Sequence, residues 1–181
     1  RVPWSAATVG GRLRVLMSLL RGGQERPVVI ASVQALLTPL PEPSALRGRM
    51  RVLRPGAVQS LTELATFLSA NGYRHEAVAE VPGTFSRRGG LLDVFPMAEV
   101  RPVRLDFFGD MLDTIRWFDP DSQRSQGTCD RVVLTPAGEA VAEMDPEGLA
   151  ALEAVECTGC HAAAMADWER DLEHLRMGQL P

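Results

Sequence analysis

Apolar residues in the first part of the chain follow two different spacings. Between Leu13 and Leu20 they recur every three or four positions, which predicts an amphipathic helix. Val28–Ala31 is a short, β-branched apolar run typical of a buried strand, and Ser32 then caps a short helix that carries Leu36 and Leu37. Helix, buried strand and helix in this order predict an α/β layer over residues 1–48.

A second helix is predicted within residues 60–72, after a strand at Arg49–Arg54. Ser60–Glu63 is a capping box, in which a hydroxyl and a carboxylate each pair with a backbone N–H that lacks a helical partner. Apolar residues then recur on one face, and Asn71-Gly72 supplies residues that tolerate the left-handed conformation at a helix end.

From about Val81 to Val133 the pattern changes to short strands separated by glycine-containing turns. Three apolar runs, Leu91–Phe95, Val103–Phe108 and Leu112–Phe118, predict an antiparallel meander. Helical patterns return from Pro146 onward. We therefore predict an inserted α+β domain at residues 49–137, with a helical segment at 138–181 that returns to pack on residues 1–48, because neither flank alone is long enough to bury a core.

Alternation along Val103–Phe108 singles out one strand face. The odd-numbered residues are all apolar and form the natural core side, so Arg104, Asp106 and Phe108 share the opposite face. A phenylalanine beside an arginine on an outward face is the composition of a binding hot spot. The alternative is that Phe108 turns into a second layer while Arg104 pairs with Asp106 or Asp93.

Two arginines precede the strand at Leu91–Phe95. In Arg87-Arg88-Gly89-Gly90 the glycines permit a sharp turn that leaves the arginines exposed at its start. They are either part of a binding surface or ordinary solvated turn residues.

The kind of basic residue excludes two classes of enzyme. The chain has 19 basic residues, and all of them are arginine. A chain without lysine contains neither the lysine of a phosphate-binding P-loop nor a Schiff-base lysine. We expect no ATP hydrolysis, and no arrangement of Ser, His, Cys and Asp has the spacing of a catalytic site, so the chain is not expected to be an enzyme.

Charge is unevenly distributed. Residues 1–80 hold 10 arginines and 5 acidic residues, whereas residues 138–181 hold 2 arginines and 10 acidic residues. A nucleic-acid-binding module using the basic front therefore remains an alternative, although the pI of about 5.4 is far below that of a dedicated nucleic-acid-binding protein.

Cys157-Thr-Gly-Cys160-His161 has the C-x-x-C-H spacing of haem attachment, and C-x-x-C also opens many zinc sites. The remaining cysteine and histidines follow at irregular spacings, so a second pair of zinc ligands is not evident. A metal or redox protein centred on Cys157 and Cys160 is the alternative from another class. We expect no cofactor and no bound metal.

Three ordered blocks carry a resemblance to a known family. Gly83–Pro96 (GTFSRRGGLLDVFP), Pro102–Asp110 (PVRLDFFGD) and Ile115–Ser125 (IRWFDPDSQRS) resemble the UvrB homology region. That region is found in the repair helicase UvrB and at the N-terminus of the bacterial transcription-repair coupling factor, Mfd. Ala31–Pro41 and Asp119–Ser125 are more similar to the coupling factor, and a fragment of UvrB is the nearest alternative.

The resemblance implies a fold and a partner. It implies a degenerate, helicase-like (RecA-like) α/β domain without ATPase activity, interrupted by a small α+β domain with an antiparallel sheet that binds UvrA. By position, the family's UvrA-contacting residues fall on Arg88, Arg104 and Phe108. We expect these three to form one exposed patch, so that changing any of them to Ala weakens UvrA binding and leaves the melting temperature nearly unchanged.

The resemblance also implies a setting for the chain. It would be a monomeric adaptor, in the cytoplasm and without a membrane segment, that brings nucleotide excision repair to stalled RNA polymerase. RNA polymerase and DNA would be bound by other parts of the full-length protein, which would be an ATP-dependent DNA translocase.

Overall fold

The structure, a computed structural model, describes residues 5–138 and 146–176 except for 22–27, 39 and 156–158. The chain divides into two compact units, Arg1–Glu139 and Ala140–Pro181, which are taken separately below. The first unit holds four helices and eight strands among its described residues: α1 Ala6–Arg21, α2 Val33–Leu37, α3 Pro43–Gly48, β1 Arg51–Leu53, α4 Leu61–Ala70, β2 Arg74–His75, β3 Thr84–Arg88, β4 Leu91–Phe95, β5 Val103–Phe108, β6 Met111–Phe118, β7 Ser125–Thr128 and β8 Val132–Leu134.

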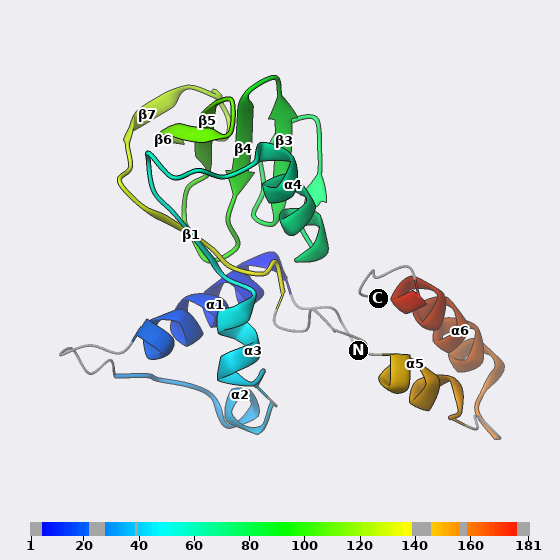
Figure 1. The fold of residues 1–181 in the computed structure, drawn as a ribbon. Helices are drawn as coiled ribbons and strands as arrows, with labels where there is room; N and C mark the ends of the chain where they lie inside the picture. Colours follow the sequence, from blue (N-terminus) through cyan, green and yellow to red (C-terminus); the bar gives the residue numbers. More distant parts are fainter. Residues whose placement is uncertain (1–4, 22–27, 39, 139–145, 156–158, 177–181) are drawn as a thin grey trace. The chain divides into compact units, whose positions relative to one another are not determined.

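A six-stranded sheet forms the main body of the first unit. Its strands lie in the order β2-β3-β4-β5-β6-β7, and every neighbouring pair is antiparallel except β2 with β3. Helix α4 packs against one face of this sheet beside β3 and β4 (Figure 1). The predicted strands at Leu91–Phe95 and Val103–Phe108 are confirmed with the same bounds, and the antiparallel meander is confirmed with them.

Helix α4 begins and ends as its sequence predicts. The hydroxyl of Ser60 accepts a hydrogen bond from the backbone N–H of Glu63 at 3.4 Å, which satisfies one of the free donors of the first turn. After Asn71 the chain leaves the helix through Gly72, whose φ of +81° lies in the left-handed region that glycine adopts without strain.

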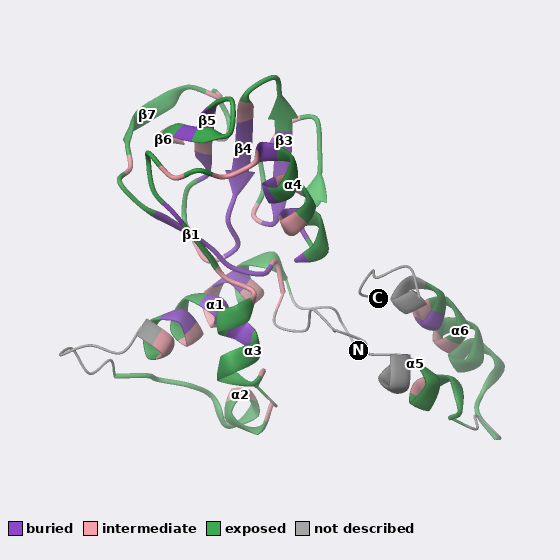
Figure 2. Cartoon of the chain, viewed as in Figure 1, coloured by how far each residue is buried: buried purple, intermediate pink, exposed green. Residues whose placement is uncertain are grey.

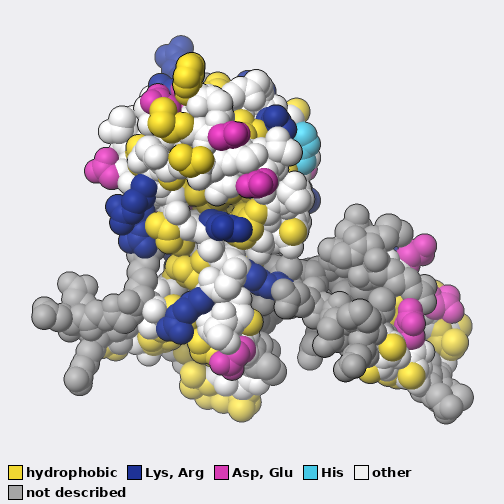
Figure 3. All heavy atoms as spheres, in the orientation of Figure 1, with side chains coloured by type: hydrophobic (Ala, Val, Ile, Leu, Met, Phe, Trp, Pro, Cys, Tyr) yellow, Lys and Arg dark blue, Asp and Glu magenta, His cyan; other side chains and the backbone are white. Residues whose placement is uncertain are grey.

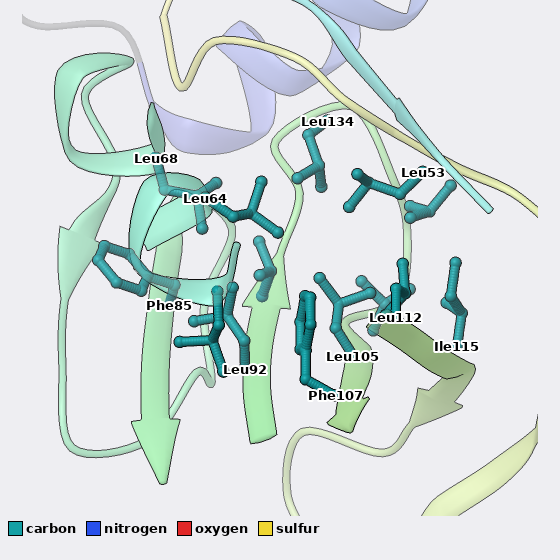
Figure 4. Close-up of a cluster of buried hydrophobic side chains, with 14 of the residues drawn as sticks. Leu53, Leu64, Leu68, Phe85, Leu92, Leu105, Phe107, Leu112, Ile115 and Leu134 are labelled. Carbon is teal, nitrogen blue, oxygen red and sulfur yellow. The ribbon is translucent and has the colours of Figure 1, made fainter. Parts of the chain in front are cut away.

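The core lies between α4 and the facing side of the sheet. Leu64 and Leu68 from α4 point toward Phe85, Leu92 and the strands beyond them (Figure 4). Figure 2 shows the buried residues gathered in the strands and on the inner side of α4. The predicted core residues of β5 are confirmed, since Val103 and Leu105 are fully buried and Phe107 is 7% exposed.

At the end of this core that contains Leu53 and Leu134 lie a two-stranded ladder and a buried tyrosine. β1 pairs antiparallel with β8, with Leu53 opposite Val132. The Tyr73 hydroxyl donates a hydrogen bond to the carbonyl of Thr135 at 2.9 Å and accepts one from the backbone N–H of Met97 at 3.2 Å. Burial raises the pKa of Tyr73 to about 12, because the phenolate would lose its hydration.

A smaller cluster joins α1 and α3 to the chain just after β4. Leu13, Leu46 and Met97 are buried together. Gly10 permits this approach, since a Cβ at that position would lie 2.6 Å from the backbone oxygen of Met97.

The predicted strand at Val28–Ala31 is wrong. These residues have no regular structure, and the side chains of Val28 and Ile30 are 91% and 96% exposed. A strand needs a neighbouring strand for its backbone groups, and within the described part of residues 5–50 all the regular structure is helical. The mixed α/β composition of the chain is confirmed, while a RecA-like domain is not seen in these residues.

The second unit contains two helices in its described residues, α5 Pro146–Glu153 and α6 Ala162–Arg176. α5 begins at Pro146 as predicted, and Leu172 of α6 is buried. The predicted packing of residues 138–181 on residues 1–48 stays a prediction. In the part of the chain that the structure describes, no helix is long and apolar enough to cross a membrane.

Candidate protein-binding surface

The candidate residues lie on the face of the six-stranded sheet opposite α4, which we call the outer face. Register places its side chains in rows across the strands, because directly paired residues point to the same side of a sheet. One row runs from Arg88 to Leu91 and on to Asp106. The next row runs from Ser86 to Asp93 and Arg104. The strand alternation therefore assigned Arg104 to the correct side of the sheet, and the register places Arg88 on that side as well.

Asp93 and Arg104 form the centre of the outer face. The Asp93 carboxylate accepts Nε–H of Arg104 at 2.7 Å and an Nη2–H at 2.8 Å, a two-pronged pair in which both of its oxygens are used. The Asp93 side chain is 2% exposed and that of Arg104 14%. This hydrogen bonding raises the pKa of Arg104 above its ordinary value. Of the two carboxylates that the sequence offered as partners for Arg104, it is Asp93 that pairs with it.

Arg104 is held from two further sides. Its Nη1 donates to the backbone carbonyl of Gln123 at 3.3 Å, in the loop between β6 and β7. Its guanidinium lies over the ring of Phe118, 5.0 Å from the centroid. A side chain with this many intramolecular contacts has little left to offer a partner. The expectation that Arg104 belongs to an exposed patch is therefore wrong, since its side chain is only 14% exposed.

Arg88 shares the same carboxylate and remains accessible. Its Nη2 donates to Oδ2 of Asp93 at 3.1 Å, and its side chain is 55% exposed. A guanidinium has five N–H donors, so this single bond leaves Arg88 able to engage a carboxylate or carbonyl of another molecule.

The turn that carries Arg88 depends on its two glycines. Gly89 has a φ of +58°, and a Cβ on Gly90 would lie 2.9 Å from the carbonyl oxygen of Phe107. β3 can therefore turn directly into β4 while staying close to β5. The sequence correctly placed Arg88 at the end of a tight hairpin.

Phe108 belongs to an exposed apolar row at the end of the sheet. It is 81% exposed and is paired across the β5–β6 hairpin with Met111, which is 41% exposed. Met111 in turn forms a bridge with Val58, which is 86% exposed. Three exposed apolar side chains thus follow one another across the sheet end, and Phe108 does not turn into a second layer.

Sequence reasoning missed Met111, Val58 and Asp93. The Gly109-Asp110 turn, with Gly109 at a φ of +61°, was the signal that could have paired Phe108 with Met111. Val58 gave no such signal, because it reaches the row by a single bridge from a segment outside the named strands. Asp93 was considered only as a partner that would neutralise Arg104.

A second ion pair occupies the same face with less burial. Arg116 donates to Asp106 at 2.8 Å, and their side chains are 37% and 36% exposed. Basic, acidic and apolar side chains are interspersed on the visible face of the space-filling view (Figure 3).

The structure offers no metal centre among its described residues, where no group of three His, Cys, Asp or Glu side chains could hold an ion. Cys157, half of the C-x-x-C pair, lies outside the described residues, and Cys160 is an exposed free thiol.

A shared buried carboxylate, an accessible arginine and a flat apolar row together make the kind of surface that binds another protein. Arginine and aromatic residues are the types most enriched where such interfaces are strongest. Fold and site thus define a small α+β domain whose mostly antiparallel sheet presents these side chains on its outer face.

Residues 52–139 match the family model described as the UvrB interaction domain. The chain is 38% identical over 131 residues to the transcription-repair-coupling factor of Escherichia coli and 42% identical over 137 residues to that of Myxococcus xanthus. The Bacillus subtilis protein of the same name is 34% identical over 130 residues.

These matches cover 72%, 74% and 72% of the chain but only 11% of each relative. The chain thus corresponds to about a tenth of the length of the coupling factors that it matches. The resemblance to the UvrB homology region of the coupling factor, stated above from three sequence blocks, is confirmed.

Proposed function

We propose that residues 52–139 bind UvrA through the outer face of the sheet, and that the chain is the adaptor region by which a transcription-repair coupling factor recruits nucleotide excision repair to stalled RNA polymerase. The observation that carries the proposal is the exposure of Phe108, 81%, in a row with Met111 and Val58 on a sheet whose outer face also carries the accessible Arg88. An apolar side chain displayed so fully contributes little to folding, which makes a role in recognition the simplest reason for the row.

The proposed contacts differ among the residues of the outer face. Phe108, Met111 and Val58 would enter an apolar depression of UvrA, and Arg88 would donate to a carboxylate or to backbone carbonyls. Lysine should replace Arg88 poorly, because an ammonium cannot make the two parallel bonds of a guanidinium. Arg104, which is mostly buried, would hold Asp93 in place beneath this surface and would contribute little of the contact area itself.

The wider setting is part of the same proposal. The chain would carry out recognition without chemistry, as a monomer in the cytoplasm, and other parts of the full-length protein would engage RNA polymerase and DNA. The relatives that carry the coupling-factor name favour this over a fragment of UvrB.

The helicase-like α/β domain also remains a proposal. Residues 28–40 display several apolar side chains to solvent, among them Val28 at 91%, Ile30 at 96% and Leu37 at 79%. Apolar surface in this amount is typical of a layer whose covering is missing, which fits a larger domain completed by the rest of the protein.

The experiment compares neighbouring arginines on one strand. Arg87 lies on the opposite side of β3 from Arg88, where its Nη1 approaches the hydroxyl of Thr62 at 3.5 Å. We expect Arg88→Ala and Phe108→Ala to weaken binding of purified UvrA about tenfold or more, measured by calorimetry with the 181-residue chain. Arg87→Ala removes the same charge and should change the affinity less than about twofold.

Equal losses from Arg87→Ala and Arg88→Ala would show that only net charge matters and would overturn the site. Normal binding by both Arg88→Ala and Phe108→Ala would overturn the proposed surface altogether.

A further inference from the structure

We infer that Asp93 is a positioning residue for UvrA binding: this buried carboxylate, fixed by Arg104, orients the guanidinium of Arg88 toward the partner while making no contact with the partner itself. The inference rests on the proposed function and divides the residues of the outer face into those that contact the partner and those that position them. Arg88 and Phe108 would contact UvrA, whereas Asp93 and Arg104 would hold Arg88 in place.

The first step concerns access. Asp93 is 2% exposed, so a partner docking on the outer face cannot reach its carboxylate without displacing what covers it. Arg104 is little better placed, with 14% of its side chain exposed. Any influence of Asp93 on binding must therefore pass through a more accessible neighbour.

The second step concerns geometry. Oδ2 of Asp93 accepts hydrogen bonds from both arginines, at 2.8 Å from Nη2 of Arg104 and 3.1 Å from Nη2 of Arg88. Oδ1 accepts from Nε of Arg104 at 2.7 Å, which prevents the carboxylate from rotating. Because the carboxylate is fixed in this way, its hydrogen bond to Arg88 restricts the orientation of the Arg88 guanidinium.

The third step concerns what orientation contributes. A free arginine samples many rotamers, and fixing it at an interface costs free energy when the complex forms. A bond present before binding moves part of this cost to folding, so the partner meets a guanidinium already in place. The bond uses one donor of Arg88, and the others remain for the partner.

Charge supports the same assignment. Two arginines around one carboxylate leave a net positive charge at this point of the outer face. Arg104 neutralises Asp93, so the positive charge of Arg88 remains available to an incoming carboxylate while its bond to Asp93 stays in place. If Arg104 were absent, Arg88 would be the sole partner of Asp93 and would be held back from UvrA.

The test is a double-mutant cycle on the 181-residue chain with purified UvrA, using Asp93→Asn and Arg88→Ala singly and together. Asparagine keeps the size of the side chain, but only one of its two terminal atoms is a hydrogen-bond acceptor. It therefore cannot replace the carboxylate, whose two oxygens both accept hydrogen bonds from arginine. We expect Asp93→Asn to weaken UvrA binding about fivefold to tenfold in the wild-type background and less than about twofold in the Arg88→Ala background. Its effect on the melting temperature should differ little between the two backgrounds, because Arg104 is the main partner of Asp93 and the bond to the more exposed Arg88 contributes less.

This pattern separates positioning from general damage to the fold. A role in the fold alone would weaken binding equally in both backgrounds, and that result would overturn the inference. Normal binding by Asp93→Asn, when Arg88→Ala binds weakly, would overturn the inference and leave the proposed function standing. Normal binding by Arg88→Ala would instead remove the proposed contact itself.

A second variant covers the case in which Asp93→Asn does not fold. Arg104→Lys keeps a positive charge beside Asp93 but cannot hold both carboxylate oxygens in one plane. It should also weaken UvrA binding only when Arg88 is present. Equal weakening with and without Arg88 would count against positioning in the same way.

Discussion

The two faces of the six-stranded sheet are formed by the same strands and held by different forces. Toward α4, the side chains of β4, β5 and β6 are apolar and largely buried, with Leu92, Leu105 and Leu112 at 0% exposure. On the outer face an acid and an arginine, Asp93 and Arg104, are largely buried and are fixed by hydrogen bonds. Phe107 and Phe108, consecutive in β5, belong one to each face.

This difference separates stability from recognition within single strands. Apolar burial on the α4 side stabilises the domain without regard to direction, while the outer face depends on hydrogen-bond geometry. Arg104 is the residue at which the two roles meet, because its loss would strand a buried carboxylate and also change the surface. The experiments below test the separation, beginning with the largest expected effect.

The largest effect is expected from the phenylalanine pair of β5. Phe107→Ala should lower the free energy of unfolding by about 3–5 kcal/mol, because it leaves a cavity among Leu92, Leu105 and their neighbours. Phe108→Ala makes the same chemical change on a side chain that is 81% exposed, and should cost about 0.5 kcal/mol or less. Urea denaturation of the two variants measures both values. Similar losses in stability from the two changes would mean that the faces are not separate.

Arg104 should give the next largest effect. Arg104→Ala removes the main partner of a carboxylate that is 2% exposed, so we expect the free energy of unfolding to fall by about 3 kcal/mol. Arg116→Ala is the matched control, because its pair with Asp106 is more than a third exposed and should contribute about 0.5 kcal/mol or less. Thermal denaturation of both variants provides the comparison. An unchanged melting temperature for Arg104→Ala would restore the earlier expectation that Arg104 is a freely exposed contact residue.

The sequence predicted which side of the sheet each β5 residue occupies, because alternation depends only on local backbone geometry. It could not predict how deeply Arg104 is buried. That depends on the loop between β6 and β7, which brings the carbonyl of Gln123 within 3.3 Å of Arg104 and has no periodic pattern of its own.

The apolar, β-branched composition of Val28–Ala31 predicted a strand that does not form, because a strand also depends on a partner elsewhere in the chain. A short apolar run becomes a strand only when another strand lies beside it, and nothing in residues 28–31 specifies such a partner. The helix at Leu61–Ala70 was predictable because its cap, its apolar face and its terminating glycine all lie within its own sequence. The row of Val58, Met111 and Phe108 was not, because it joins segments about fifty residues apart.

The smallest effect concerns Tyr73, a buried ionisable residue of the main core cluster. Tyr73 is the only tyrosine of the chain and there is no lysine, so a change in stability between about pH 10 and pH 12 is expected to report on this side chain. Burial raises the pKa of Tyr73 to about 12 in the folded protein, above the value of about 10 expected in the unfolded chain.

The sign of the pH effect follows from these two values. The folded protein holds the phenolic proton more tightly than the unfolded chain, so the contribution to stability is complete below about pH 10 and is lost as the pH rises through about 12. The full loss corresponds to about 2–3 kcal/mol. Unfolding by urea as a function of pH measures the loss, and the absorbance of the single tyrosinate reports its ionisation directly.

Tyr73→Phe should be less stable at neutral pH, because the Met97 N–H and the Thr135 carbonyl lose their partner. Its stability should nevertheless not fall between about pH 10 and pH 12. The same alkaline decline in Tyr73→Phe would place the titrating group elsewhere and would show that the α4 side of the core is purely apolar in its response to pH.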